Sequence, residues 1–246
     1  MIQEIVKEFT KRFPLSEGLT NWDNMGILIS SKNNNKNILL TIDLTDEVLD
    51  ECLNKNIQNV ISYHPVIFKG FKSINSEEVV YKCILNSIAV YCPHTSLDKL
   101  MNEYLLKQIK ISLNDQDFSF SFDSLACIGK INNNISQIAD VVKKLLNLEK
   151  VRIAYPQNKE FIPENVLVGV GAGFTYVNVT NSLVITGEMR HHEILHAVKY
   201  GNVVILVEHS NGERFYLSEL RNICAQLLPD FNIFISQKDK DPIEII

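Results

Sequence analysis

The sequence lacks any apolar run long enough to cross a membrane. Its longest apolar stretches, such as Val203–Val207, are far shorter than the roughly 18 residues of a spanning helix. It also lacks a basic stripe, since the net charge is −5, so a direct nucleic-acid partner is not expected. Because 46% of the residues are hydrophobic, the chain does not have the composition of a disordered protein. We therefore predict a soluble globular protein with neither a membrane nor a nucleic-acid partner.

Signals for disulfides and for phosphate loops are also missing. The chain has five cysteines, an odd number with no CxxC pair. The first residues show apolar side chains at helical spacing instead of a secretory pattern. Neither GxxxxGKS nor GxxxxGKT occurs, which excludes a triphosphate site of that kind. We expect reduced thiols and a cytoplasmic location; the cysteines are Cys52, Cys83, Cys92, Cys127 and Cys224.

Short apolar runs alternate with segments of helical period, and this alternation predicts an α/β protein. The predicted strands are Gly26–Ile29, Ile38–Ile42, Asn59–Ser62, Ala89–Cys92, Leu125–Ile131, Val151–Ala154, Val166–Gly169, Leu183–Ile185, Val203–Val207 and Ile233–Ile235. The predicted helices are Ile2–Phe13, Asp46–Asn54, Glu77–Asn86, Met101–Ile109, Ile135–Leu146, Glu188–Tyr200 and Glu213–Leu227.

One stretch, Asn114–Ser124, breaks both periods, and we predict a linker there. It divides the chain into an N-terminal α/β lobe, residues 1–113, and a second α/β lobe, residues 114–246. In an alternative arrangement the last strand, at about residues 230–246, returns to the first lobe.

All six histidines lie just beyond the end of a predicted strand or on the helix that follows one. In open α/β sheets, ligands bind in the crevice at the carboxyl ends of strands, so this placement predicts a polar site there. The side chains are His64 after the strand ending at Ser62, His94 and Asp98 after the strand ending at Cys92, His191 after the strand ending at Ile185, and His209 and Glu213 after the strand ending at Val207.

Two motifs repeat a histidine followed four residues later by a carboxylate, His94 with Asp98 and His209 with Glu213. On a helix this spacing places both side chains on one face. Together with His64 they offer nitrogen and oxygen ligands that suit Zn²⁺, Mn²⁺, Fe²⁺ or Co²⁺ without soft thiolates. Each has a simpler alternative: His64 as a capping histidine, Asp98 exposed at a helix start, and Glu213 as a first-turn acid that complements the helix dipole.

The segment from His192 to His196 matches HExxH, in which a metalloprotease helix presents two zinc ligands and a glutamate base. A helical wheel places both histidines on the polar face of the predicted helix. It places His191 on the buried face, together with Ile194, Leu195 and Val198. A protease site would need the two histidines in a cleft, so we favour a solvated helix face.

Two glycine-containing segments are candidate phosphate sites. The glycines from Gly169 to Gly173 follow a strand but lack the GxGxxG spacing, so we predict a tight turn there. The segment Thr186–Glu188 is a predicted helix start whose free N–H groups can hold an anion. Neither segment by itself identifies a ligand.

Five motifs, taken in order, resemble those of the Nif three-like family, whose members are also described as GTP cyclohydrolase 1 type 2 homologues. The resemblance runs from about Trp22 to Leu220. It implies two α/β lobes with mixed sheets flanked by helices, a dinuclear metal site in the cleft between the lobes, and a toroidal homohexamer. The motifs are Trp22–Gly26, Ser62–Phe68, His94–Asp98, Thr186–His192 and Glu208–Arg214.

The resemblance also implies metal ligands at His64, Asp98, His209 and Glu213, the last as the carboxylate that bridges two metals. The chain departs from the family pattern at one position, where Tyr63 replaces the first histidine of a His-His-Pro motif. A neutral phenol, with a pKa of about 10, is a poor ligand. We therefore expect one tight site, formed by His64, His209 and Glu213, and one site that is weak or empty.

The activity that the resemblance implies is metal-assisted hydrolysis, with attack on C8 of a guanine ring to begin opening of the imidazole. His94 or His191 would act as general acid or base. Candidate phosphate contacts are Lys69, Arg190 and Arg214, so a nucleotide or another small phosphorylated compound is the expected substrate. A phosphoesterase fits the residues equally well. In the alternative of a different class, the chain binds metal without turnover and interacts with a transcriptional coactivator.

Overall fold

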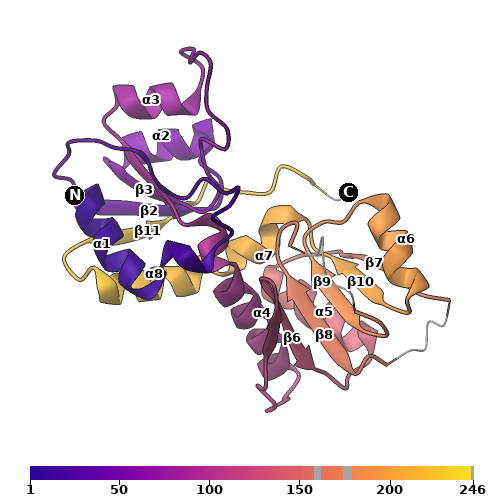
Figure 1. The fold of residues 1–246 in the computed structure, drawn as a ribbon. Coiled ribbons are helices and arrows are strands. Elements are labelled where there is room, and N and C mark those ends of the chain that lie inside the picture. Colours follow the sequence, from indigo (N-terminus) through magenta and orange to yellow (C-terminus); the bar gives the residue numbers. More distant parts are fainter. Residues whose placement is uncertain (158–161, 174–178, 245–246) are drawn as a thin grey trace. The chain divides into compact units, whose positions relative to one another are not determined.

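A computed structural model of the chain describes residues 1–157, 162–173 and 179–244 (Figure 1). It forms two compact units, each with its own sheet and helices. The first unit consists of Met1–Leu97 with Leu217–Lys240, and the second consists of Asp98–Tyr216 with Asp241–Ile246. The boundary expected from the sequence lies between residues 113 and 114.

The first unit is built on a five-stranded sheet in the order β1-β4-β3-β2-β11. The four strands from β4 to β11 run parallel, and β1 is antiparallel to β4 at one edge. Each of the central strands β2, β3 and β4 is buried almost throughout, which explains their continuous apolar sequences. The strands are β1 (Gly26–Ile29), β2 (Asn37–Thr41), β3 (Asn59–Ser62), β4 (Ala89–Cys92) and β11 (Asn232–Ile235).

Helices cover both faces of this first sheet (Figure 1). On one face, α2 (Asp46–Asn54) and α3 (Val79–Leu85) pack against the sheet residues Leu39, Val60 and Val90. On the other face lie α1 (Ile2–Arg12) and α8 (Leu217–Leu227), which contact each other. Two short 3₁₀ helices, η1 (Leu15–Glu17) and η2 (His94–Leu97), lie in the connections.

The second unit is built on a six-stranded mixed sheet in the order β5-β6-β8-β9-β10-β7. Its central strands β8, β9 and β10 run parallel and are buried, while β6 and β7 pair with them in antiparallel fashion. The strands are β5 (Ser121–Asp123), β6 (Ala126–Lys130), β7 (Arg152–Ala154), β8 (Asn165–Gly169), β9 (Leu183–Thr186) and β10 (Val203–Leu206).

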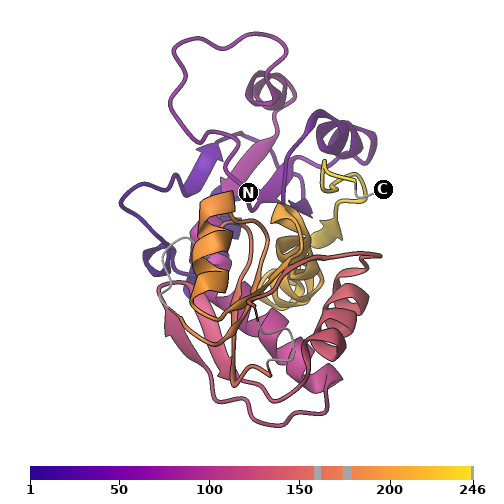
Figure 2. The same cartoon turned by 90° about the vertical axis from the view of Figure 1, so that its right-hand side faces the viewer.

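The helices of the second unit also lie on two faces of their sheet (Figure 2). On one face, Ala197 of α6 (His191–Lys199) packs against Val184 and Val204. On the other face lie α4 (Asp98–Ser112) and α5 (Ile135–Leu146), with α7 (His209–Phe215) in contact with both. The Asn134 side chain accepts a hydrogen bond from Gln137 N–H at the start of α5.

The α/β class with two helix-flanked sheets is therefore confirmed, and two details of the sequence interpretation are wrong. The predicted linker contains β5, a strand whose three residues are all exposed and therefore show no alternation of burial. The predicted helix Glu213–Leu227 is in fact two helices, α7 and α8, which belong to different units.

Within the described ranges, no helix is both long enough and apolar enough to span a membrane. All five cysteines are buried and free. Burial raises the pKa of thiols such as Cys52 and Cys224 to about 12, so these thiols are unreactive at neutral pH.

Candidate functional site

In the first unit, polar side chains gather where the parallel strands end. β2 leads to Asp43, β3 leads to His64 and β4 leads to His94. β1 is antiparallel, with Gly26 opposite Cys92, so the segment that precedes β1 reaches the same edge of the sheet. This carboxyl edge is the usual place for ligands in α/β sheets, as the sequence led us to expect.

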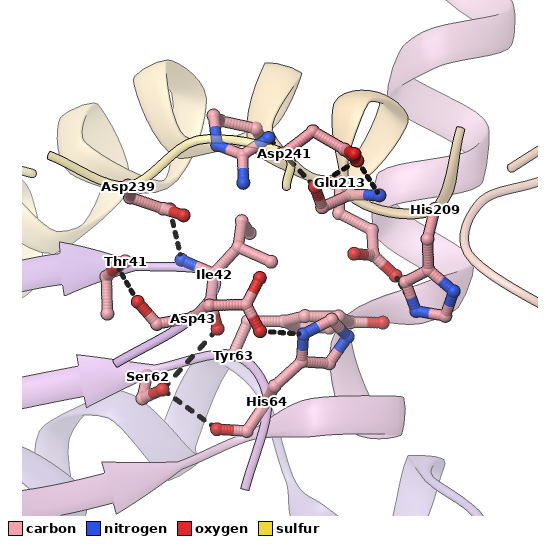
Figure 3. A network of polar contacts seen from close by, with 12 residues as sticks. Thr41, Ile42, Asp43, Ser62, Tyr63, His64, His209, Glu213, Asp239 and Asp241 are labelled. Atoms are coloured by element: carbon pink, nitrogen blue, oxygen red, sulfur yellow. Dashed lines mark hydrogen bonds and ion pairs between the residues drawn. The ribbon is translucent and has the colours of Figure 1, made fainter. Parts of the chain in front are cut away.

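His64 is held by the ends of two neighbouring strands (Figure 3). Its Nδ1 lies 2.8 Å from Oδ1 of Asp43, which follows β2. The Thr41 hydroxyl donates to the Asp43 carbonyl at 2.8 Å, and the Ser62 hydroxyl donates to the His64 carbonyl at 2.8 Å. The carboxylate favours the tautomer with the proton on Nδ1, in which Nε2 is the nitrogen that can bind a metal.

Tyr63 lies inside the sheet edge and not at its surface. Its side chain is buried, and its ring centroid is 4.9 Å from that of His64 and 5.3 Å from that of His94. The Cys92 thiol donates to the Tyr63 carbonyl at 3.0 Å, and burial raises the pKa of this thiol. The tyrosine therefore supports the two imidazole rings by packing.

His94 forms a second imidazole–carboxylate pair in the same unit. Its Nδ1 lies 2.6 Å from Oδ1 of Asp23, and the Thr95 hydroxyl donates to the other carboxylate oxygen at 2.6 Å. Burial disfavours ionisation of Asp23, but the hydrogen bonds from His94 and Thr95 outweigh burial and lower the pKa of this carboxyl. His94 has a φ of +35°, a left-handed conformation that is costly for a histidine and is typical of functional sites.

In the second unit, His209 and Glu213 lie one turn apart at the start of α7, just beyond β10 (Figure 3). His209 Nε2 is 3.7 Å from Oε1 of Glu213, whose side chain is buried. On the other side of the ring, His209 Nδ1 is 3.2 Å from Oε1 of Glu188, which follows β9. His209 is thus a third imidazole with a carboxylate at Nδ1.

The backbone around this pair is specialised. Glu208 begins the turn into α7 with a φ of +64°, and Arg152 binds its carboxylate through two hydrogen bonds of 2.8 and 3.0 Å. Gly171, which follows β8, has a φ of +59°. A Cβ atom there would overlap Oε1 of Glu213 and would lie 3.4 Å from Nε2 of His209. The tight turn predicted at Gly171 thus makes room for the two side chains.

The other predicted site residues lie in different surroundings. Asp98 is the first residue of α4 and is buried in the second unit. Lys69 and Arg190 are exposed, and Arg214 donates to the Ser210 hydroxyl at 3.0 Å. These surroundings do not assign a function to any of the four residues, so each stays a prediction from the sequence.

The predicted burial of the α6 face is partly wrong. His191, expected on the buried face, is exposed at the first position of the helix, and Leu195 is 49% exposed. Ala197 is the buried residue of this helix and Ile194 is partly buried. The buried face is therefore turned about the helix axis from the face that the helical wheel predicted. His192 and His196 are exposed, in agreement with a solvated helix face.

Sequence reasoning missed the three carboxylates that contact Nδ1 of the histidines. Asp23 and Glu188 lie within motifs that the sequence singled out, but no role was given to either. Asp43 was harder to identify from the sequence, because it lies in none of the motifs and is distinguished by its position two residues after a strand end. Pairs between different strand ends depend on the order of strands in the sheet, which the sequence does not state.

The fold and these side chains define a two-unit α/β protein with imidazole and carboxylate groups at the carboxyl edges of both sheets. The profile of the Duf34/NIF3 family (NGG1p interacting factor 3) matches residues 1–242. The chain belongs to this family.

Individual relatives agree with this assignment. NIF3-like protein 1 of Drosophila melanogaster is 34% identical over 255 residues, which cover 97% of this chain and 87% of that protein. NGG1-interacting factor 3 of Saccharomyces cerevisiae is 30% identical over 281 residues, covering 99% and 96%. The crystal structure of a Bacillus cereus protein related to NIF3 has a TM-score of 0.83 at 17% identity, covering 100% and 99%, and shows the same fold.

Proposed function

We propose that the chain binds a divalent metal ion through His64, His209 and Glu213 and uses it in hydrolysis. Two imidazoles and a carboxylate are donors that suit Zn²⁺, Mn²⁺, Fe²⁺ or Co²⁺. His64 follows β3, and His209 and Glu213 lie on α7.

One observation carries this proposal: the imidazoles of both His64 and His209 have a carboxylate at Nδ1. The partners are Asp43 at 2.8 Å and Glu188 at 3.2 Å. Metal-ligating histidines almost always donate their other ring N–H to such a partner, which fixes the tautomer and makes the ligand more basic. The residues present therefore fit a metal bound through Nε2.

A second metal position is proposed to be weak or empty. Asp98 and Glu213 are the carboxylates that the family resemblance implies for it, and the imidazole expected at residue 63 is replaced. Tyr63 is buried and packs against His64, and a neutral phenol is a poor ligand.

The proposed hydrolysis divides the chemistry between the metal and the chain. A bound divalent ion supplies a nucleophile at neutral pH by lowering the pKa of a coordinated water toward 7. In the chain, His94 is the proposed general acid or base, because Asp23 engages Nδ1 and leaves Nε2 to exchange a proton with the substrate. His191, exposed at the start of α6, is the alternative.

The proposed substrate is a nucleotide or another small phosphorylated compound, as the resemblance to GTP cyclohydrolase 1 type 2 homologues implies. Lys69, Arg190 and Arg214 are the proposed phosphate contacts. We also propose a cytoplasmic location and assembly as a homohexamer, both of which rest on the sequence interpretation.

Turnover of nucleotides by metal-loaded protein tests the hydrolase proposal. Purified protein is loaded with Zn²⁺ or Mn²⁺ and incubated with GTP and a nucleotide panel, and the products are resolved by chromatography and mass spectrometry. We expect a product with wild type and with His196→Ala, and none with Glu213→Ala. Nucleotides that all stay intact would overturn the hydrolase proposal. Activity lost in His196→Ala but kept in Glu213→Ala would instead favour the HExxH helix.

A second function, metal binding without turnover in an interaction protein, has a specific observation in its favour. The Saccharomyces cerevisiae relative is named NGG1-interacting factor 3, and Tyr63 stands where the family resemblance implies an imidazole. This function predicts metal bound by wild type, no turnover of any nucleotide, and an unchanged set of binding partners in Glu213→Ala if the interaction is independent of the metal.

A further inference from the structure

Two aromatic side chains beside His94 are exposed to solvent in the first unit. Trp22 and Phe68 are each 52% exposed although both are large and apolar. Their ring centroids lie 6.1 Å apart with an interplanar angle of 55°. Such rings leave apolar surface in water, and a further flat ring that covers them gains favourable contact energy.

His94 meets this pair edge-on. Its ring centroid is 6.2 Å from that of Trp22 and 6.5 Å from that of Phe68, with interplanar angles of 86° and 81°. Asp23 engages Nδ1 of His94, so Nε2 is the ring nitrogen left for a hydrogen bond with a ligand. The cluster therefore combines flat apolar faces with a polar group, as sites for heteroaromatic rings do.

The two segments that carry these rings are fixed to the body of the first unit. The Asn24 side chain donates to the Ile67 carbonyl and so joins the segment of Trp22 to that of Phe68. Leu19 N–H donates to the Thr95 hydroxyl at 2.9 Å, and the same hydroxyl donates to Asp23. Because the two segments are held before a ligand arrives, binding costs less conformational entropy.

The charge on the segment that carries Phe68 favours an anionic ligand. Lys69 directly follows Phe68 and Lys72 directly follows Phe71; all four residues are exposed, and the stretch 68–72 contains no acidic residue. Positive side chains beside an aromatic pair complement a ring that carries a phosphate or a carboxylate.

We propose that Trp22 and Phe68 form a stacking site for a planar heteroaromatic ring with an attached anionic group. This assigns the residues that would bind the ring of the nucleotide proposed above as substrate, and to this extent it rests on the proposed function. Binding itself requires neither metal nor turnover, because none of the proposed metal ligands belongs to the pair.

Trp22 is the single tryptophan of the chain, so its fluorescence reports on this site alone. The metal-free protein, kept in EDTA, is titrated with adenosine 5′-monophosphate under selective tryptophan excitation. We expect saturable quenching by this nucleotide. Adenosine, compared with the nucleotide at low salt, should bind more weakly. Ribose 5-phosphate, which lacks the ring, should cause no quenching. Phe68→Ala should weaken the affinity roughly 5- to 100-fold, the effect of losing one stacked ring.

Phe71→Ala is the matched control, because Phe71 is an exposed aromatic residue of the same segment, and its affinity should equal that of wild type. The proposal is overturned if Phe68→Ala binds the nucleotide as tightly as Phe71→Ala does. It is also overturned if ribose 5-phosphate quenches like the nucleotide, or if neither the nucleotide nor adenosine quenches. It is also overturned if dilution of the protein alone changes the fluorescence, since a second copy would then cover the rings.

Metal content and turnover, measured on the same proteins, separate this proposal from the hydrolase. Metal binding and nucleotide turnover without any quenching would contradict only the stacking site. Saturable quenching without metal or turnover would contradict only the hydrolase.

Discussion

Three histidines of this chain, His64, His94 and His209, share one local arrangement in which a carboxylate lies at Nδ1. In each case the carboxylate comes from a different strand end or segment than the histidine. The arrangement favours the tautomer with the proton on Nδ1, in which Nε2 can bind a metal or transfer a proton. Two of the three are the imidazoles that we propose as metal ligands.

Asp43 is expected to strengthen metal binding by His64. Asp43→Asn replaces the carboxylate at Nδ1 of His64 with a neutral amide, so the ring loses the charged acceptor that makes it a more basic ligand. We expect zinc affinity, measured by competition with a chromophoric chelator, to fall about 10- to 100-fold. The control is Asp46→Asn on the surface of α2, where Asp46 pairs with Lys82. Equal affinities of the two variants would contradict the proposed role of Asp43.

Tyr63 offers a gain-of-function test. Tyr63→His restores the imidazole that the family resemblance implies, and we expect the bound metal to rise from about one to about two equivalents per chain. Elemental analysis of the dialysed variant measures this directly. Tyr63→Phe is the control, because it removes the hydroxyl without adding a ligand. A wild-type chain that already binds two metals at comparable occupancy would show that Tyr63 does not weaken the second position.

The lowered pKa of Asp23 predicts that the stability of the fold depends on pH. The folded state lowers the pKa of this carboxyl below its usual 3.8, so ionised Asp23 stabilises the fold above about pH 4. That contribution is lost as the pH falls through the lowered pKa. Asp23→Asn should therefore be less stable than wild type at pH 6, and the difference should shrink toward pH 2.5, as urea unfolding measures.

The control for Asp23 is Asp140→Asn, a substitution of an exposed carboxylate on α5. Its free energy of unfolding should follow that of wild type throughout this pH range. A difference between Asp23→Asn and wild type that stays constant from pH 6 to pH 2.5 would mean that the carboxylate charge does not stabilise the fold.

At the scale of elements, the sequence predicted best where burial is complete. The predicted strands Asn59–Ser62 and Ala89–Cys92 coincide with β3 and β4, because every residue of these parallel strands is buried and apolar runs mark them clearly. β5 escaped prediction because its three residues are all exposed. The buried face of α6 was misjudged because contact with β10, and not the hydrophobic pattern alone, sets its rotation.

The turn after β8 carries a prediction of its own. Gly171→Ala adds a Cβ where Glu213 and His209 lie, in a left-handed backbone conformation that alanine adopts only with strain. We expect lower zinc affinity and about 1 kcal/mol or more of lost stability, measured by chelator competition and urea unfolding. Gly70→Ala is the control, because a Cβ there meets open space. Unchanged zinc affinity in Gly171→Ala would show that the turn does not position these ligands.

At the scale of the whole molecule, each unit is assembled from segments that are distant in the sequence. Leu217–Lys240 joins Met1–Leu97 because β11 pairs with β2 and α8 packs against the same sheet. Periodicity identifies strands and helices but does not state which sheet a strand enters. The sequence therefore predicted two α/β parts and the strand-end histidines, while the partners of those histidines required the structure.

The central claim, that His64, His209 and Glu213 bind one divalent metal ion, is tested most directly by metal content per chain. Elemental analysis is carried out on untagged wild type, His64→Ala, Glu213→Ala and His196→Ala, each reloaded with Zn²⁺ and dialysed. We predict about one equivalent in wild type and His196→Ala, and almost none in either His64→Ala or Glu213→Ala. Metal retained in either of the latter variants would contradict the claim.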